Sequence, residues 1–117
     1  MKEFLYLFRG GDAARMQEQQ SPEKWQQHMM KWKSWMETLA EQGKSIGGQP
    51  LGKEGSVIKG SGKKMTDGPF VEGKEIVGGY LIVKANHLQE ATEMAKDCPI
   101  FEHDGIVEVR EIQQFQV

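Results

Sequence analysis

The pattern of apolar and polar positions predicts three clear strands. Residues 3–8 (EFLYLF), 75–84 (EIVGGYLIVK) and 105–115 (GIVEVREIQQF) are short runs rich in branched and aromatic side chains. Such runs, when glycine, proline or charged residues flank them, are typical of strands. The glycine-rich segment after the first predicted helix adds two weaker strands, near residues 45–46 and 56–59.

Two helices are predicted between these strands. Ser21 and Pro22 suit the start of the first, because serine caps free amide groups and proline loses no hydrogen bond there. Gly43 suits its end. The second helix is expected to have Asn86 as its cap and to stop at Pro99. The apolar positions of the first helix recur at helical spacing and predict one stripe toward a core. These positions are Trp25, Met29, Trp32, Met36, Leu39 and Ala40.

The order of these elements predicts the fold class. Strand, helix, two weak strands, strong strand, helix and strand form an α+β sandwich with both helices on one face of the sheet. The simplest match is the ferredoxin-like, split βαβ arrangement, with a four- to five-stranded antiparallel sheet. The chain length of 117 residues predicts a single domain over residues 1–117.

The strands are apolar on both faces, which predicts a partner. In the first strand Phe4, Tyr6 and Phe8 lie on one face, and Leu5 and Leu7 lie on the other. Two helices can cover only one face of such a sheet. We therefore expect a homodimer in which two sheets pack face to face, as a dimeric α/β barrel. The alternative is that the loops of residues 44–64 fold over the open face.

Composition excludes several classes of function. The chain has 15 basic and 17 acidic residues, a net charge of −2 and no basic block. We therefore expect neither a nucleic-acid partner nor membrane attachment. Its N-terminal apolar run is too short for a signal peptide or a membrane span. The single cysteine, Cys98, forms no intrachain disulfide, which predicts a cytoplasmic protein.

The segment of residues 66–83 (TDGPFVEGKEIVGGYLIV) contains the first candidate site. A tight Asp-Gly-Pro turn would hold Phe70 and Glu72 at fixed positions toward a pocket, where Asp67 orients or deprotonates a ligand. The structural alternative is that Asp67 only closes the turn and Phe70 only fills the core. These residues alone favour the structural alternative.

Two consecutive glycines interrupt the strong strand. Gly78 and Gly79 leave room for a ligand or a partner chain, or they form a structural bulge, and the residues do not decide between these. Tyr80 would point its hydroxyl into the same space in the first case.

One histidine lies among the tryptophans of the first helix. His28 and Trp32 are one turn apart, so His28 is a candidate general base or ligand clamp. The structural alternative, a partly exposed histidine on the side of the helix, is favoured by the residues alone. His87, His103 and Cys98 match no zinc spacing, so we expect no metal and no cofactor.

These motifs together resemble the YCII-related family, in its branch marked by the DGPF motif. The similarity extends over nearly the whole chain through SPEKW, GGQPL, TDGPFVEGKEIVGGYLIV, the second helix and GIVEVREI. The resemblance implies a ferredoxin-like fold, a dimeric α/β barrel and a cavity between sheet and helices, with Asp67, Phe70 and Glu72 near its mouth. Some relatives use a His–Asp pair for small-molecule chemistry, such as dehydrochlorination of an aromatic ring. Others occur beside alternative sigma factors, which implies regulation.

This chain departs from the family at one position. Relatives often carry a histidine where, counting back from Gly43, this chain has Trp32, and His28 lies one turn earlier. Two functions therefore stay open. The first is a regulatory or ligand-binding module walled by Trp32, Phe70, Glu72 and Tyr80. The second is a cofactor-independent lyase or hydrolase in which His28 is the base and Asp67 or Asp97 orients it. The aromatic Trp32 favours the binding module, because an indole binds ligands but transfers no proton.

Overall fold

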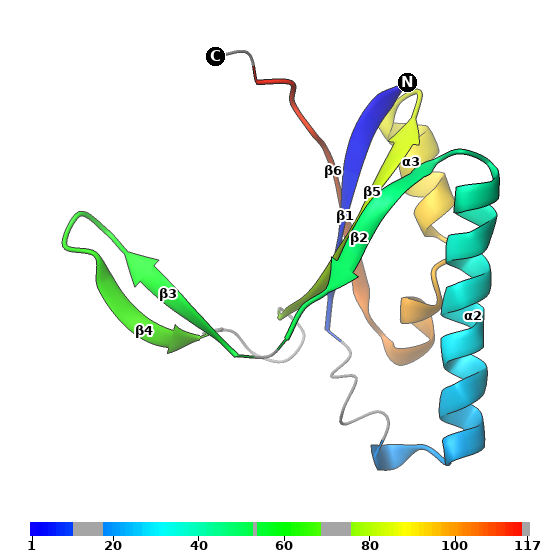
Figure 1. Ribbon diagram of the computed structural model, residues 1–117, viewed down its shortest axis with the longest axis horizontal. Helices are drawn as coiled ribbons and strands as arrows, with labels where there is room; N and C mark the ends of the chain where they lie inside the picture. Colours follow the sequence, from blue (N-terminus) through cyan, green and yellow to red (C-terminus); the bar gives the residue numbers. More distant parts are fainter. Residues whose placement is uncertain (11–17, 53, 69–75, 116–117) are drawn as a thin grey trace.

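The structure, a computed structural model, describes residues 1–10, 18–52, 54–68 and 76–115 (Figure 1). Its elements follow one another as β1 (Lys2–Arg9), α2 (Pro22–Glu41), β2 (Ser45–Pro50), β3 (Gly55–Lys59), β4 (Lys64–Gly68), β5 (Val77–Ala85), α3 (Leu88–Ala95), the 3-10 helix η2 (Pro99–His103) and β6 (Ile106–Glu111). No helix in the described part of the chain is long and apolar enough to cross a membrane.

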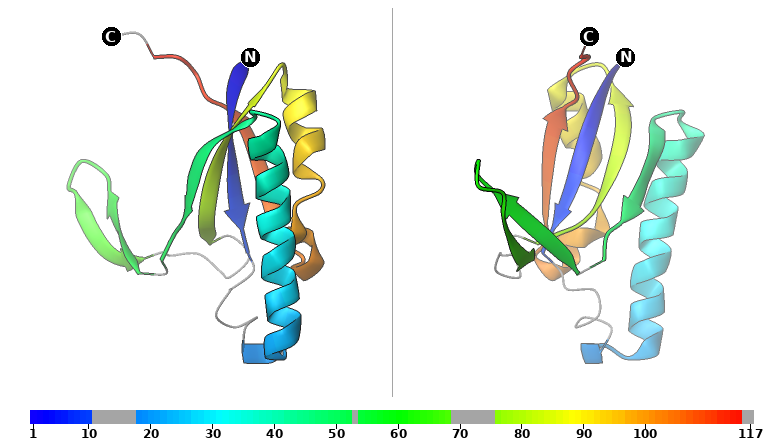
Figure 2. Two further views of the ribbon diagram at one scale, coloured as in Figure 1. Left: turned by 45° about the vertical axis from the view of Figure 1, so that its right-hand side comes forward. Right: turned by 60° about the vertical axis from the view of Figure 1, so that its left-hand side comes forward.

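Four strands form the main sheet in the order β2-β5-β1-β6, and all neighbours are antiparallel. Because β1 and β2 both run antiparallel to β5, they are parallel to each other and are connected through α2, which makes a split βαβ unit. Both helices cover the same face of this sheet (Figures 1 and 2). The predicted α+β, ferredoxin-like fold is therefore confirmed.

A two-stranded hairpin, β3–β4, is inserted between β2 and β5 and stands away from the main sheet (Figure 2). Strand β4 was not expected from the sequence. Asp67 and Gly68, expected to begin a turn, instead pair with Ser56 and Gly55 on β3. The turn prediction is wrong for these two residues because cross-strand pairing outweighs the local turn preference of Asp-Gly. The rest of the expected turn lies outside the described residues.

The core lies between the sheet and the two helices. Phe4 and Tyr6 of β1 are fully buried, and the Tyr6 ring stacks on Trp35 with ring centroids 6.2 Å apart. The Tyr6 hydroxyl donates a hydrogen bond to the carbonyl of Ala91 on α3. Cys98 is also buried, and burial raises the pKa of its thiol to about 12, as expected for an unreactive core cysteine.

The face of α2 that packs on the core differs from the predicted stripe. The buried residues of α2 are His28, Trp35 and Leu39. In contrast, Met29 is 45% exposed and Met36 is 36% exposed. Of the predicted stripe, Leu39 is buried in the core and Trp32 packs half-buried against it. The prediction is wrong for the rest of the stripe, most of which is turned toward a cavity.

The N-terminus of α3 also differs from the prediction. Nδ1 of His87, not Asn86, accepts the capping hydrogen bond from the Glu90 amide. The Asn86 side chain instead donates to the Glu90 carboxylate. The helix ends at Ala95, and Pro99 begins η2.

The sheet face away from the helices has no cover among the described residues. Leu5, Leu7 and Ile82 lie on this face and are half-buried in the single chain. The alternative that residues 44–64 fold over this face finds no support, since β2 joins the sheet edge and the hairpin makes few contacts with the main sheet.

Candidate functional site

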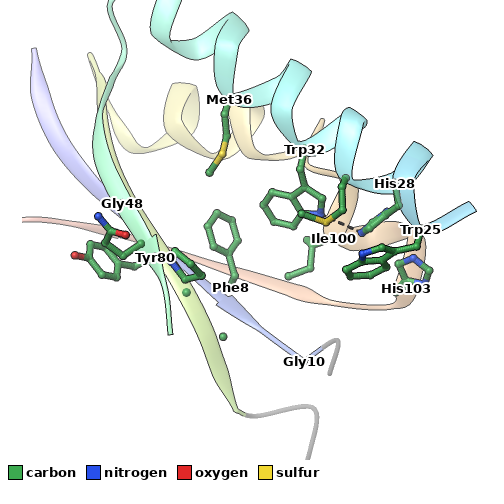
Figure 3. A pocket seen from close by; sticks show the side chains of 15 residues that line it. Phe8, Gly10, Trp25, His28, Trp32, Met36, Gly48, Tyr80, Ile100 and His103 are labelled. Atoms are coloured by element: carbon green, nitrogen blue, oxygen red, sulfur yellow. Dashed lines mark hydrogen bonds between the residues drawn. The ribbon is translucent and has the colours of Figure 1, made fainter. Parts of the chain in front are cut away.

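A cavity of about 340 Å³ lies between α2 and the sheet (Figure 3). Its lining is mostly apolar and includes side chains from α2, the sheet and η2. The lining residues are Phe8, Gly10, Trp25, His28, Met29, Trp32, Met36, Gly48, Gln49, Pro50, Gly78, Gly79, Tyr80, Ile100 and His103. The stripe predicted for the core thus supplies the helical wall of the cavity.

Aromatic rings from opposite walls meet edge to face. The Phe8 ring of β1 lies 5.2 Å from the Trp32 ring of α2, and Trp32 lies 5.9 Å from Trp35. Edge-to-face contacts of this kind hold the rings in defined orientations. Trp32, in the helical wall of the cavity, therefore contacts the core directly through Trp35.

The glycines on β2 and β5 let these strands approach closely. A Cβ added to Gly48 would lie 2.1 Å from the carbonyl oxygen of Tyr80, and one added to Gly79 would lie 3.1 Å from that of Gln49. Gly78 differs, since its nearest neighbour, the Phe8 carbonyl, would be 4.0 Å away. Gly48 is therefore required by the close approach of the two strands, and Gly79 is tightly packed. All three glycines leave the cavity floor without side chains.

His28 is the buried polar residue of the site, with 5% of its surface exposed. Its Nε2 lies 3.1 Å from the indole nitrogen of Trp32, and its Nδ1 lies 3.0 Å from Oε2 of Glu102. An indole N–H only donates, so Nε2 must accept, and Nδ1 then carries the proton that it donates to Glu102. The expectation of a partly exposed histidine is wrong, because η2 packs beside α2 at this point.

Glu102 of η2 anchors the histidine ring from the solvent side. Its other carboxylate oxygen lies 2.6 Å from the ammonium group of Lys31. The hydrogen bond from Lys31, followed by that from His28, lowers the pKa of Glu102 below its ordinary value. Glu102 is therefore ionised at neutral pH and accepts hydrogen bonds on both oxygens.

His103 completes the polar end of the cavity. Its ring lies 4.5 Å from the His28 ring, edge to face, and its Nε2 lies 3.2 Å from the side-chain nitrogen of Gln20. The Oε1 atom of Gln20 is buried and has no hydrogen-bond partner among the described residues.

The ligating atoms of His28, Glu102 and His103 lie within 4.8 Å of one another, as a metal site would require. The hydrogen bonds argue against a metal. A metal bound to Nδ1 of His28 would require the ring proton to lie on Nε2. That proton would then face the indole N–H of Trp32, so two donors would meet. Histidine ligands normally donate their second N–H to an acceptor. The ammonium group of Lys31 also lies on the same carboxylate.

The structure brings together only some of the candidates expected from the sequence. His28 and Trp32 both line the cavity, joined by a hydrogen bond (Figure 3). Tyr80 also belongs to the lining, but strand alternation places its side chain on the opposite face of the sheet from buried Gly79 and Leu81 (Figure 3).

The expected carboxylates and Phe70 lie elsewhere. Asp97 is exposed in the turn after α3 and is absent from the described lining. Asp67 belongs to β4. Phe70 and Glu72 lie outside the described residues.

Sequence reasoning missed Glu102 as the partner of His28. No local signal marks this glutamate, because the folding of η2 against α2 brings it there. The cavity-lining role of Trp25 and Met29 was hidden for a different reason. An apolar stripe has the same sequence pattern whether it faces a core or a cavity.

The fold and site define a ferredoxin-like α+β protein with an apolar cavity that ends at a histidine–carboxylate pair. The model of the YCII-related domain matches residues 12–116 of this chain. The chain belongs to the YCII-related family, as the motifs of its sequence predicted.

One solved structure similar to this chain is 5-chloro-2-hydroxyhydroquinone dehydrochlorinase (TftG) from Burkholderia phenoliruptrix AC1100, in complex with 2,5-dihydroxybenzoquinone. The two have 16% sequence identity and a TM-score of 0.47, over 92% of this chain and 91% of that one. No curated protein matches the chain at a significant level.

Proposed function

We propose that this protein is a small-molecule-binding module whose ligand is planar and largely apolar and lies in the cavity between α2 and the sheet. The observation that carries the proposal is the cavity itself, about 340 Å³ in volume and walled by Phe8, Trp25 and Trp32. Ligand sites are typically concave, mostly apolar and furnished with a few convergent polar groups. Here those polar groups are His28 and His103, at one end.

The cavity dimensions and lining favour a ligand of one or two fused rings. Its volume is at the lower end of the range of roughly 300–1,000 Å³ for small-molecule sites. Aromatic side chains bind flat rings by offset or edge-to-face contact. The lining has no Lys, Arg, Asp or Glu in the described part of the chain, which disfavours a highly charged ligand.

A thermal-shift screen of mono- and bicyclic aromatic compounds tests this proposal. A ligand that binds only the folded protein raises its melting temperature by mass action. We expect a compound whose effect is lost in Trp32→Ala and kept in Lys33→Ala, a change on the exposed side of the same helix. If no compound raises the melting temperature, or if every effect survives Trp32→Ala, the proposed site is wrong.

A second candidate function is cofactor-independent catalysis of the lyase or hydrolase type. The pairing of His28 Nδ1 with Glu102 favours it, because a carboxylate on one ring nitrogen orients a histidine that acts as a base through the other. Trp32 occupies that other nitrogen, so a substrate would first have to displace it. If a ligand is turned over, Glu102→Gln should lower kcat by roughly 100-fold or more while it retains binding. Unchanged turnover would exclude the His28–Glu102 pair as the base.

We also propose that a second copy of the chain covers the open face of the sheet. Leu5, Leu7 and Ile82 make this face apolar, and symmetric dimers are the commonest oligomers. Light scattering should give twice the chain mass of 13.3 kDa for the wild type. Leu7→Glu should give a monomer, whereas Leu88→Glu, at an exposed position on α3, should stay dimeric. A wild-type monomer would refute this assembly.

A further inference from the structure

The polar end of the cavity holds one donor and one acceptor that satisfy each other. The indole N–H of Trp32 donates to Nε2 of His28 over 3.1 Å, and both residues line the cavity (Figure 3). Within the described residues, each of these two atoms has the other as its hydrogen-bond partner. A ligand that enters this end must either leave the pair intact or replace both halves of it.

The roles of the two atoms are fixed. Trp32 can only donate. His28 is held as an acceptor at Nε2, because its Nδ1–H donates a hydrogen bond to the ionised Glu102. Lys31 binds the other oxygen of that carboxylate from the solvent side. A second proton on His28 would place two N–H donors against each other. When the two side chains turn apart, the site offers one donor and one acceptor at neighbouring positions.

We propose, on the basis of the ligand-binding function above, that the ligand is a planar ring that carries a hydrogen-bond acceptor and a donor on adjacent positions. A cyclic amide or a hydroxyl beside a carbonyl has this arrangement. The ligand acceptor takes the N–H of Trp32, and the ligand donor gives its proton to Nε2 of His28. Both halves of the internal hydrogen bond are then replaced.

Ligands with only one of these groups are discriminated against. A compound that takes the Trp32 donor but offers none to His28 leaves a buried acceptor unpaired, which weakens binding on the order of 10-fold. Glu102 supports this selectivity, because its hydrogen bond holds the proton of the neutral ring on Nδ1 and leaves Nε2 as the acceptor.

Three matched bicyclic probes test the proposal by titration calorimetry on the full chain. 2-Quinolinone has adjacent N–H and C=O groups, N-methyl-2-quinolinone retains only the carbonyl, and quinoline has only a ring nitrogen acceptor. We expect the wild type to bind 2-quinolinone about 10-fold more tightly than either of the others. Trp32→Phe keeps a ring against Phe8 but lacks the N–H, so it should lose most of this preference. Trp25→Phe, at another wall of the same cavity, should retain it.

Each outcome decides a different claim. Equal affinities of the three probes for the wild type overturn the inference, as does a preference that Trp32→Phe leaves unchanged. If aromatic compounds from the thermal-shift screen bind but 2-quinolinone does not, the inference fails and the binding function stands. If no aromatic compound binds, both fail.

Discussion

Nδ1 of His28 lies 3.0 Å from Oε2 of Glu102, although 74 residues separate the two in the sequence. The fold creates this contact by packing η2 beside the first half of α2. The contact determines which ring nitrogen of His28 carries the proton and which way the ring faces. The chemistry of the cavity therefore depends on a carboxylate outside its lining.

Replacement of Glu102 should change how stability depends on pH. Lys31 and His28 lower the pKa of Glu102 in the folded protein below the unfolded value of about 4.3. A lowered folded pKa contributes stability above the unfolded pKa, and this contribution is lost as the pH falls through the folded value. Urea unfolding at a series of pH values should thus show a shallower loss of stability below about pH 5 in Glu102→Gln than in the wild type.

The matched control is Glu37→Gln, on the exposed side of α2. Its pH profile below neutrality should stay closer to that of the wild type. Identical acid profiles for Glu102→Gln and the wild type would show that the Lys31–Glu102–His28 contacts do not contribute to stability.

The two tyrosines should differ in what their hydroxyl groups contribute. The hydroxyl of Tyr6 is buried and donates to the Ala91 carbonyl, so Tyr6→Phe leaves a buried acceptor without its partner. We expect a loss of about 1–2 kcal/mol in the free energy of unfolding. Tyr80→Phe, on the other face of the sheet, should cost less. Chemical denaturation measures both, and equal losses would contradict the role given to Tyr6.

The two glycines Gly48 and Gly78 should tolerate alanine differently. A Cβ on Gly48 would lie 2.1 Å from the carbonyl oxygen of Tyr80, so β2 and β5 would have to separate. Thermal unfolding of Gly48→Ala should show a loss of about 1–3 kcal/mol or more. Gly78→Ala meets nothing closer than 4.0 Å and should stay near the wild type. If Gly48→Ala is as stable as Gly78→Ala, close strand approach does not explain this glycine.

The elements that depend on local signals could be predicted from the sequence. Ser21 and Pro22 marked the start of α2, and the apolar runs marked β1, β5 and β6. The order of these elements was enough for the α+β class, and the DGPF segment and its neighbours were enough for the family. Each of these signals acts over a few residues and so survives without tertiary information.

The site could be predicted only in part. The sequence singled out His28 and Trp32. It suggested Asp67 or Asp97 as the partner of His28, whereas the partner in the structure is Glu102. The sequence did not show that one side of α2 lines a cavity, because tryptophan and methionine side chains suit a core and a cavity wall equally well. Strand β4 was missed because Lys64–Gly68 contains little apolar pattern and is held by pairing with β3.

The ligand site between α2 and the sheet is tested most directly by a substitution that fills part of the cavity. Met36 lines the cavity, whereas Met30 is 63% exposed on the same helix and is absent from the described lining. The affinity of the best thermal-shift ligand should be measured for the wild type, Met36→Trp and Met30→Trp. We predict that Met36→Trp weakens binding by about 10-fold or more, because the larger ring takes space that the ligand needs, and that Met30→Trp does not. Equal affinities in all three proteins would contradict a ligand site between α2 and the sheet.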